Sequence, residues 1–167
     1  VNAMFIQSMD FNDELSGIHT GSIIPATALS SAETTGSTGK ELIVSLVAGY
    51  DVAGRLADAI DAQSLFEQGY QPSGVLGSFM ASAVSSKLKY LSSWQIANAL
   101  GIAGSFAGGT IEFLKHGADT KRFNIARSAY AGSLAANLSK SGMTGPLSIF
   151  EGENGLFVAM PSRRIST

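Results

Sequence analysis

The stretch "STGKELIVSLVAGYDVAGRLADAID" at residues 37–61 decides the fold, because it has every feature of a long amphipathic helix. Thr38 and Glu41 have the spacing of a capping box, in which each side chain accepts a hydrogen bond from a backbone N–H left unpaired at the helix N-terminus. Apolar residues recur at three- and four-residue intervals and predict a broad buried face of Leu42, Leu46, Ala53 and Ile60, with Ile43, Val47, Tyr50 and Leu56 beside them. Gly49 and Gly54 each cost about 1 kcal/mol relative to Ala inside a helix. We therefore expect a neighbouring helix to approach closely at both glycines.

The same helical pattern recurs on both sides of this stretch, and strand signals are scarce. Residues 23–32 predict a short helix that tolerates Pro25 in its first turn. Residues 72–88 predict another helix, with Pro72 well placed at the first helical position.

Two further helices follow. Ser92 and Gln95 have capping-box spacing and open a helix that we expect to end at the paired glycines 108–109. A fifth helix is expected over 121–138 with Thr120 as its N-cap, and one or two helical turns come after it. The sequence therefore predicts an all-α fold, a helical bundle of about five or six helices with short loops.

Composition narrows the classes of partner. Hydrophobic residues make up 45% of the chain and charged residues only 14%, against roughly 25% charge in an average soluble domain. Such a surface is either unusually bland or partly covered by a partner, and we favour the partner because low charge with many Ala and Gly residues suits close packing between helices. The net charge of -2 and the absence of a basic run argue against nucleic acid and membrane surfaces as partners. The chain has no Cys, and neither of its two His has a second ligand at helical spacing, so we expect no metal site.

The length of 167 residues suits one domain. We expect a tag remnant and N-terminal lead-in at residues 1–9, one helical domain over 10–160, and a polar tail at 161–167. No apolar run approaches the roughly 18 residues that a membrane-spanning helix needs. Neither is there a secretion signal, so the expected location is cytoplasmic.

His19 is the first candidate for chemistry. It lies in "MDFNDELSGIHTGS", residues 9–22, just ahead of a predicted helix N-terminus, where free N–H groups and the helix dipole favour an anion such as a substrate carboxylate. An imidazole with an unperturbed pKa of about 6.5 can move a proton at neutral pH. Asp10 or Asp13 could orient it. The alternative is an ordinary histidine at a helix entry.

Lys121 and Arg122 are the second candidates. They open the fifth predicted helix, at the end where the helix dipole disfavours cations. Two cations at this position are stabilised if an anion binds beside them. The alternative is a pair of solvated charges with Asp119 as a partner.

Six motifs occur in the order in which they are found in the MmgE/PrpD family. They are "DFND" (10–13), "HTGSIIPA" (19–26), "GKELIVSLVAGYDVAGRL" (39–56), "GYQPSGVLGSFMASAVSSKLKYLSSWQIANALGIAGSFAGG" (69–109), "TKRFNIARSAYAG" (120–132) and "GMTGPLSIFEGENGLF" (142–157). The chain resembles this family, whose members include 2-methylcitrate dehydratases, cis-aconitate decarboxylases and iminodisuccinate epimerases. The resemblance implies the helical domain of a cofactor-free lyase or isomerase that acts on small di- and tricarboxylates by acid/base chemistry. It also implies a homo-oligomer, most simply a dimer.

Position by position, the resemblance assigns roles to particular residues. It implies that His19 is the base, that Lys121 holds negative charge as it develops, and that Asp10 orients the imidazole. It also implies substrate contacts, at Gly21, Ser22, Gln71, Arg122, Asn124 and Arg127. A structural role for Arg127 is an equal alternative.

The chain departs from the family pattern in two ways. Gln71 and Asn124 stand where the family has His, and an amide side chain binds a carboxylate but cannot exchange a proton at pH 7. Family members are also more than twice as long and have a smaller lid domain, so we expect an excised domain, a truncated gene or a free-standing relative, inactive alone. The alternative function is a non-catalytic helical module that acts as a homo-oligomer or a protein-interaction domain.

Overall fold

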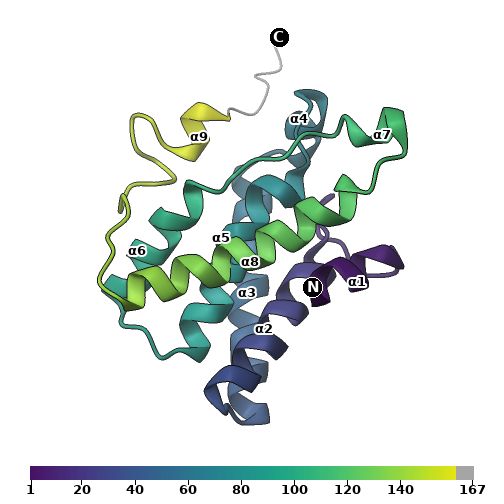
Figure 1. The fold of residues 1–167 in the computed structure, drawn as a ribbon. Helices are drawn as coiled ribbons and strands as arrows, with labels where there is room; N and C mark the ends of the chain where they lie inside the picture. Colours follow the sequence, from purple (N-terminus) through teal and green to yellow (C-terminus); the bar gives the residue numbers. More distant parts are fainter. Residues whose placement is uncertain (161–167) are drawn as a thin grey trace.

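The computed structural model of the chain describes residues 1–160, in which helices account for all regular structure apart from two isolated β-bridges (Figure 1). The predicted all-α class is confirmed. The helices are α1 (Asn2–Ser8), α2 (Thr20–Thr35), α3 (Gly39–Ala59), α4 (Ala62–Glu67), α5 (Pro72–Leu88), α6 (Ser93–Gly104), α7 (Phe113–His116), α8 (Thr120–Lys140) and α9 (Leu156–Ala159). The longest five correspond to the five predicted helices. The expected polar tail at 161–167 lies outside the described residues.

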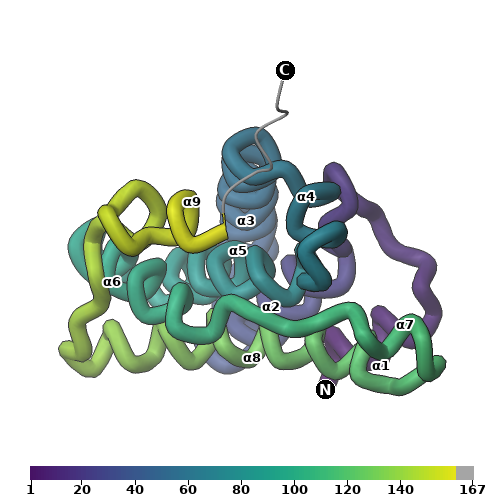
Figure 2. Tube along the Cα trace, turned by 90° about the horizontal axis from the view of Figure 1, so that it is seen from above, coloured from purple at the N-terminus to yellow at the C-terminus, as the bar shows by residue number. Residues whose placement is uncertain are grey.

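Helix α5 occupies the centre of the bundle, where it packs against α2, α3, α6 and α8 (Figure 2). The sequence predicted one buried side for this helix, but every residue from Pro72 to Ser86 is buried. Glycines make this possible by letting neighbours come close: a Cβ on Gly77 would lie 2.6 Å from Ile23 Cδ1, and one on Gly132 of α8 would lie 2.5 Å from Ala81 Cβ.

For helix α3, the structure confirms the predicted capping box and one of the two predicted close approaches at glycine. The capping box of Thr38 and Glu41 is present. Gly49 meets neighbouring helices as expected, because a Cβ there would lie 2.5 Å from Val84 Cγ2. The same expectation for Gly54 was wrong, since nothing lies within 4 Å of the position that its Cβ would occupy.

The predicted apolar face of α3 was too broad. Ile43 and Val47 are 61% and 63% exposed, whereas Ala53, Leu56 and Ile60 are buried. Helix α3 lies on the outside of the bundle and packs against α2 and α5 on one side only (Figure 2). Its other side therefore presents apolar residues to solvent.

Three predicted helix boundaries were wrong, and tertiary contacts explain two of them. Helix α2 begins at Thr20, whose hydroxyl donates to Asp13, so Pro25 lies inside the helix rather than in its first turn. Helix α6 ends at Gly104, well before the paired glycines, because Arg127 binds backbone carbonyls of the segment that follows. In α8 the N-cap is Asp119 and not Thr120.

Three short helices were not predicted. Helix α1 lies within the residues expected to be a tag remnant and lead-in, yet it packs against α2 and α8 and buries Ala3 and Gln7. Helices α4 and α7 are too short to show a helical period in the sequence.

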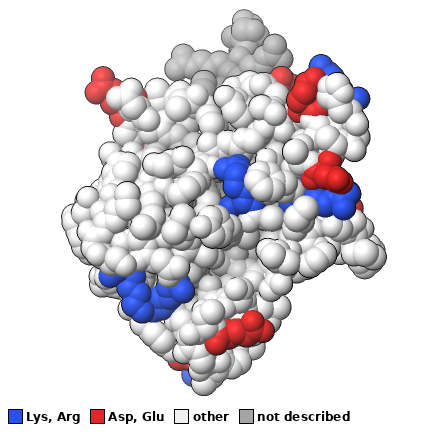
Figure 3. All heavy atoms as spheres, viewed as in Figure 1, with Lys and Arg blue, Asp and Glu red and all other residues white. Residues whose placement is uncertain are grey.

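The face of the molecule seen in Figure 3 carries only small, separate groups of charged side chains amid a wide uncharged surface. This matches the low charge of the sequence. Within residues 1–160, no helix combines the length and the apolar character needed to cross a lipid bilayer.

Candidate functional site

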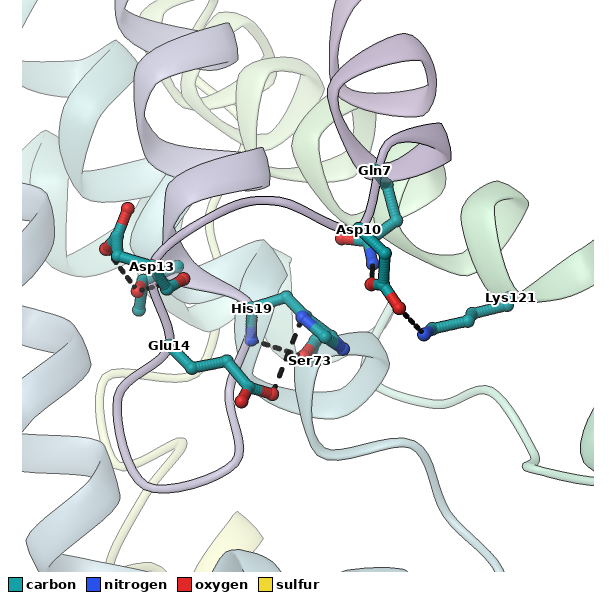
Figure 4. Close-up of polar contacts among 8 residues, drawn as sticks. Gln7, Asp10, Asp13, Glu14, His19, Ser73 and Lys121 are labelled. Atoms are coloured by element: carbon teal, nitrogen blue, oxygen red, sulfur yellow. Dashed lines mark hydrogen bonds and ion pairs between the residues drawn. The ribbon is translucent and has the colours of Figure 1, made fainter.

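The loop at residues 9–19, between α1 and α2, carries the acidic cluster and His19 (Figure 4). Asp13 fixes the path of this loop. Its Oδ2 accepts hydrogen bonds from Thr20 Oγ1 and from Tyr50 Oη, each at 2.9 Å, and its carbonyl accepts from the backbone N–H of Gly21 at 3.1 Å. Burial, reinforced by the bond to Asp13, raises the pKa of Tyr50 to about 12. Asp13 therefore anchors the loop to α2 and α3, and it is not the residue that orients His19.

His19 is the N-cap of α2, as expected from its position before a helix. Its backbone N–H donates to Ser73 Oγ of α5 at 2.8 Å, which fixes the main chain at the base of the imidazole. The side chain is 17% exposed, and its Nδ1 lies 3.5 Å from Glu14 Oε1. Burial lowers the pKa of His19 below its usual value, and the charge of Glu14 opposes that shift. The imidazole is therefore neutral at pH 7 and able to accept a proton.

Asp10 and Lys121 form an ion pair beside this histidine. Lys121 Nζ donates to Asp10 Oδ2 at 2.7 Å, and Gln7 Nε2 donates to Oδ1 of the same carboxylate, also at 2.7 Å. The bond from Lys121 holds the pKa of Asp10 below its ordinary value. Asp10 has a φ of 49°, a left-handed backbone that few residues other than glycine adopt, and Asp is among those few. The carboxylate oxygens of Asp10 bind Lys121 and Gln7 in this structure, and the acid nearest Nδ1 of His19 is Glu14.

A hollow of about 290 Å³ opens beside the ion pair, between α1, α7 and the start of α8. Its lining includes Gln7, Asp10, Leu114, Lys121 and Arg122. Arg122 is already paired, since its Nη2 lies 2.6 Å from Asp119 Oδ1. The local pairing that we gave as the alternative thus holds for Arg122, whereas the partner of Lys121 comes from a distant loop.

Gly21 and Ser22 lie in the first turn of α2, and both are buried. A Cβ on Gly21 would overlap the carboxylate of Asp13, so this position has to be glycine for the loop to close on the helix. Ser22 is fully buried, and its hydroxyl has no hydrogen-bond partner within the described residues. The structure therefore gives both residues a place in the packing beneath His19.

Gln71 and Asn124 come together around Gly109. Gln71 is the N-cap of α5, and its backbone N–H donates to the Gly109 carbonyl at 2.9 Å. Asn124 lies against Gly109 from α8 and donates to the Thr110 carbonyl at 3.4 Å. Gln71 is 4% exposed, and its Oε1 is buried without a hydrogen-bond partner in the described part of the chain.

Arg127 serves the fold rather than a ligand. Its guanidinium donates to the backbone carbonyls of Phe106, Gly74 and Gly108. Burial lowers the pKa of this arginine, which is nevertheless charged at any physiological pH. Of the two alternatives for Arg127, the structural one agrees with these contacts.

Comparison with protein families gives a match along nearly the whole chain. The MmgE/PrpD N-terminal domain matches residues 1–165. The chain belongs to the MmgE/PrpD family. The resemblance inferred from the six motifs is thereby confirmed.

Curated relatives agree with this assignment. The MmgE/PrpD chain is 30% identical to the cis-aconitate decarboxylase-like protein oryM of Aspergillus oryzae, over 96% of this chain and 35% of the relative. It is 31% identical to the cis-aconitate decarboxylase of Homo sapiens, over 93% of this chain and 33% of the relative. A cis-aconitate decarboxylase of Aspergillus terreus is 26% identical over 95% of this chain. The chain thus spans about a third of the length of these relatives.

Sequence reasoning missed three residues that shape this MmgE/PrpD site: Tyr50, Ser73 and Glu14. Tyr50 and Ser73 were read only as helix residues, although they anchor the loop and His19, and no sequence signal points to contacts across 37 and 54 positions. Glu14 lies five positions before His19 in the sequence, in the acidic stretch that precedes it. Only the loop conformation shows that Glu14 faces the imidazole.

Among residues 1–160, no three His, Asp or Glu side chains come together in a way that could hold a metal ion. The polar groups near His19 are instead one carboxylate, one ion pair and hydroxyls. Such a set of groups is suited to proton transfer and to holding an anion.

Proposed function

We propose that this MmgE/PrpD chain carries the helical half of a lyase or isomerase site that binds a small di- or tricarboxylate. The observation that supports this most directly is the Asp10–Lys121 ion pair, whose charges act on the nearby imidazole of His19 (Figure 4). The three residues come from the loop before α2, the start of α8 and the N-terminus of α2. The names of the relatives point the same way, because cis-aconitate is a tricarboxylate.

Lys121 is the proposed binding residue. It already holds one carboxylate, that of Asp10, at 2.7 Å, and its side chain is about one-third exposed beside the hollow. A substrate carboxylate would replace or share the Asp10 carboxylate as the partner of this ammonium group. The charge of Lys121 would then stabilise negative charge that develops on the substrate.

His19 is the proposed base. Its burial keeps the imidazole neutral at pH 7, so it can take a proton from the carbon next to a substrate carboxylate. Gln71 and Asn124 would contribute hydrogen bonds but no second proton transfer. We expect binding but no turnover from this segment alone, since it spans about a third of the relatives and its hollow is open to water.

Titration calorimetry with citrate, cis-aconitate and 2-methylcitrate tests the proposal. We expect saturable binding to the unaltered chain, weakened at least about tenfold by Lys121→Ala, or roughly 1.4 kcal/mol, and weakened also by His19→Ala. Lys115→Ala is the matched control, because Lys115 is an exposed lysine on α7 that pairs with Glu112. Absence of saturable binding at millimolar ligand, or equal weakening by Lys115→Ala, would contradict the proposed site.

A second candidate, a homo-oligomeric helical module, is favoured by the outer side of α3. Ile43 and Val47 are more than half exposed there, and a Cβ on Gly54 would meet no other element among residues 1–160 within 4 Å. We propose a second copy of the chain as the occupant of this side, because Ile43 and Val47 present apolar surface to solvent and two-fold homodimers are the commonest assembly. Light scattering after gel filtration should give twice the monomer mass for the unaltered chain. Val47→Glu should lower this mass toward that of the monomer, whereas the control Lys40→Glu, on the same helix, should leave it unchanged. A monomer at all concentrations would exclude this candidate.

A further inference from the structure

Three acids precede His19 in the loop, and the structure gives each of them different partners (Figure 4). Asp10 uses its two carboxylate oxygens for Gln7 and Lys121. Asp13 accepts hydrogen bonds from the hydroxyls of Thr20 and Tyr50. Glu14 alone of the three directs its carboxylate at the imidazole, with Oε1 at 3.5 Å from Nδ1.

We propose that Glu14 is the positioning residue for His19: its carboxylate selects the tautomer with hydrogen on Nδ1 and so leaves Nε2 as the nitrogen that accepts a proton. The tautomer of a histidine is set by the group that binds its other nitrogen. The proposal rests on the proposed function in one respect, namely that the proton accepted by Nε2 comes from a carboxylate substrate. The contact between Glu14 and His19 exists without a substrate.

The surroundings of His19 explain why such a carboxylate is needed. The imidazole lies at the N-terminal end of a 16-residue helix, where the dipole disfavours a positive charge. Burial and the nearby charge of Lys121 disfavour it as well. Once the ring has taken up a proton, a nearby negative charge is needed to stabilise the imidazolium.

The carboxylate of Glu14 supplies most of the negative charge that favours the imidazolium. Its charge raises the pKa of His19 more than the charge of Asp10 does, and Asp10 is itself neutralised by Lys121. Asp10, Glu14 and Lys121 are the charged groups that act on the imidazole.

The present separation suits a contact that tightens during proton transfer. At 3.5 Å the nitrogen and the oxygen are beyond the usual N–H···O range of 2.7–3.2 Å. The main chain of His19 is held by Ser73, whereas the Glu14 side chain is 51% exposed, so a small rotation of that side chain is enough to shorten the contact. Catalytic hydrogen bonds are often long in the unliganded protein and shorten in the complex.

Nitrogen-15 NMR of the full chain tests the proposal without any substrate. Long-range proton–nitrogen spectra are recorded from about pH 5 to pH 9, across the usual titration range of histidine. His19→Ala assigns the signals. We expect a protonated Nδ1 and an unprotonated Nε2 for neutral His19. In Glu14→Gln the preference for this tautomer should be lost and the pKa of His19 should fall, because a charge that favours the imidazolium has been removed. Glu14→Asp keeps the charge and should retain the tautomer.

The matched control is Glu112→Gln, which removes an acid 3.6 Å from the other histidine, His116, on α7. It should leave the tautomer and the pKa of His19 unchanged. The proposal is overturned if neutral His19 carries its proton on Nε2 in the unaltered chain, or if Glu14→Gln leaves both the tautomer and the pKa as they were. Because the spectra report on the imidazole and not on ligand binding, this inference and the proposed function can fail separately.

Discussion

Lys121 Nζ lies 2.7 Å from Asp10 Oδ2, so two residues separated by 111 positions in the sequence join the loop before α2 to the N-terminus of α8. The pair accounts for a cation at the helix end where cations are disfavoured, since a carboxylate is bound to it. It also places α1, the loop and α8 around one hollow. Any ligand that binds Lys121 has to compete with Asp10 for the ammonium group.

Asp10→Asn should lower stability in a manner that depends on pH. Because Lys121 lowers the folded-state pKa of Asp10 below its ordinary value of 3.8, the carboxylate stabilises the fold above that pH and ceases to do so as the pH falls below it. The pair is half-exposed, so we expect a loss of at most about 1 kcal/mol at pH 7. Urea unfolding at pH 7 and near pH 3 measures the difference, which should shrink at the lower pH. An equal effect at both values would mean that the charge is not the cause.

Gly49 and Gly54 should respond to alanine in opposite directions. A Cβ at Gly49 would lie 2.5 Å from Val84 Cγ2, so Gly49→Ala should destabilise the chain by about 1–3 kcal/mol through overpacking. Gly54 has open space at that position, so Gly54→Ala should stabilise it by up to about 1 kcal/mol through helix propensity. Thermal unfolding of the two variants provides the comparison, and each serves as the control for the other. Effects of the same sign would show that the packing of α3 is not as described.

Arg127→Lys should lower the stability of the fold markedly, although it exchanges one cation for another. A lysine ammonium cannot reach the carbonyls of Gly74, Phe106 and Gly108 together. Gly74 keeps Ser128 as a donor, but the partly buried carbonyls of Phe106 and Gly108 would lose Arg127, at a cost of about 1–3 kcal/mol each. We expect a loss of about 2–4 kcal/mol in urea unfolding. Arg122→Lys is the control, since Arg122 pairs with an exposed aspartate and should lose less than about 1 kcal/mol. Similar losses of stability for the two variants would argue against a structural role for the hydrogen bonds from Arg127 to these carbonyls.

Tyr50→Phe should remove one anchor of the site loop. Loss of the hydrogen bond to Asp13 should cost about 1 kcal/mol at pH 7. The folded-state pKa of Tyr50 is raised to about 12, so the unfolded chain loses this proton first and stability falls as the pH rises toward 12. The variant should lack that part of the alkaline loss, which denaturant unfolding between pH 9 and roughly pH 11 can measure. An alkaline profile parallel to that of the unaltered chain would contradict the role of Tyr50.

Local signals in the sequence were reliable because they depend on residues close together in the chain. The capping boxes at Thr38 and Ser92 are both present, and Pro72 lies at the first position of its helix. Signals that depend on a partner were not reliable. Gly49 and Gly54 look alike in the sequence, and only the positions of α2 and α5 distinguish them.

The candidate site divides in the same manner. His19 and Lys121 could be singled out from their positions at helix ends, and the family resemblance assigned Asp10. The partners of Asp10, His19 and Asp13 could not be predicted, because a loop without helical or strand period has no regular geometry from which contacts follow. Asp13 illustrates this, since it seemed a candidate for orienting His19 and instead closes the loop onto Thr20 and Tyr50.

The burial of α5 on all sides has a consequence for how the chain opens. Backbone amides at the centre of a fold exchange with solvent deuterium only through global unfolding, whereas segments held by exposed polar contacts exchange through smaller openings. Amides of α5 should therefore report the full free energy of unfolding, and those of residues 9–17 a much smaller one. This part of the loop should open and close many times while Ile18 stays in the core and the helix beneath it stays intact.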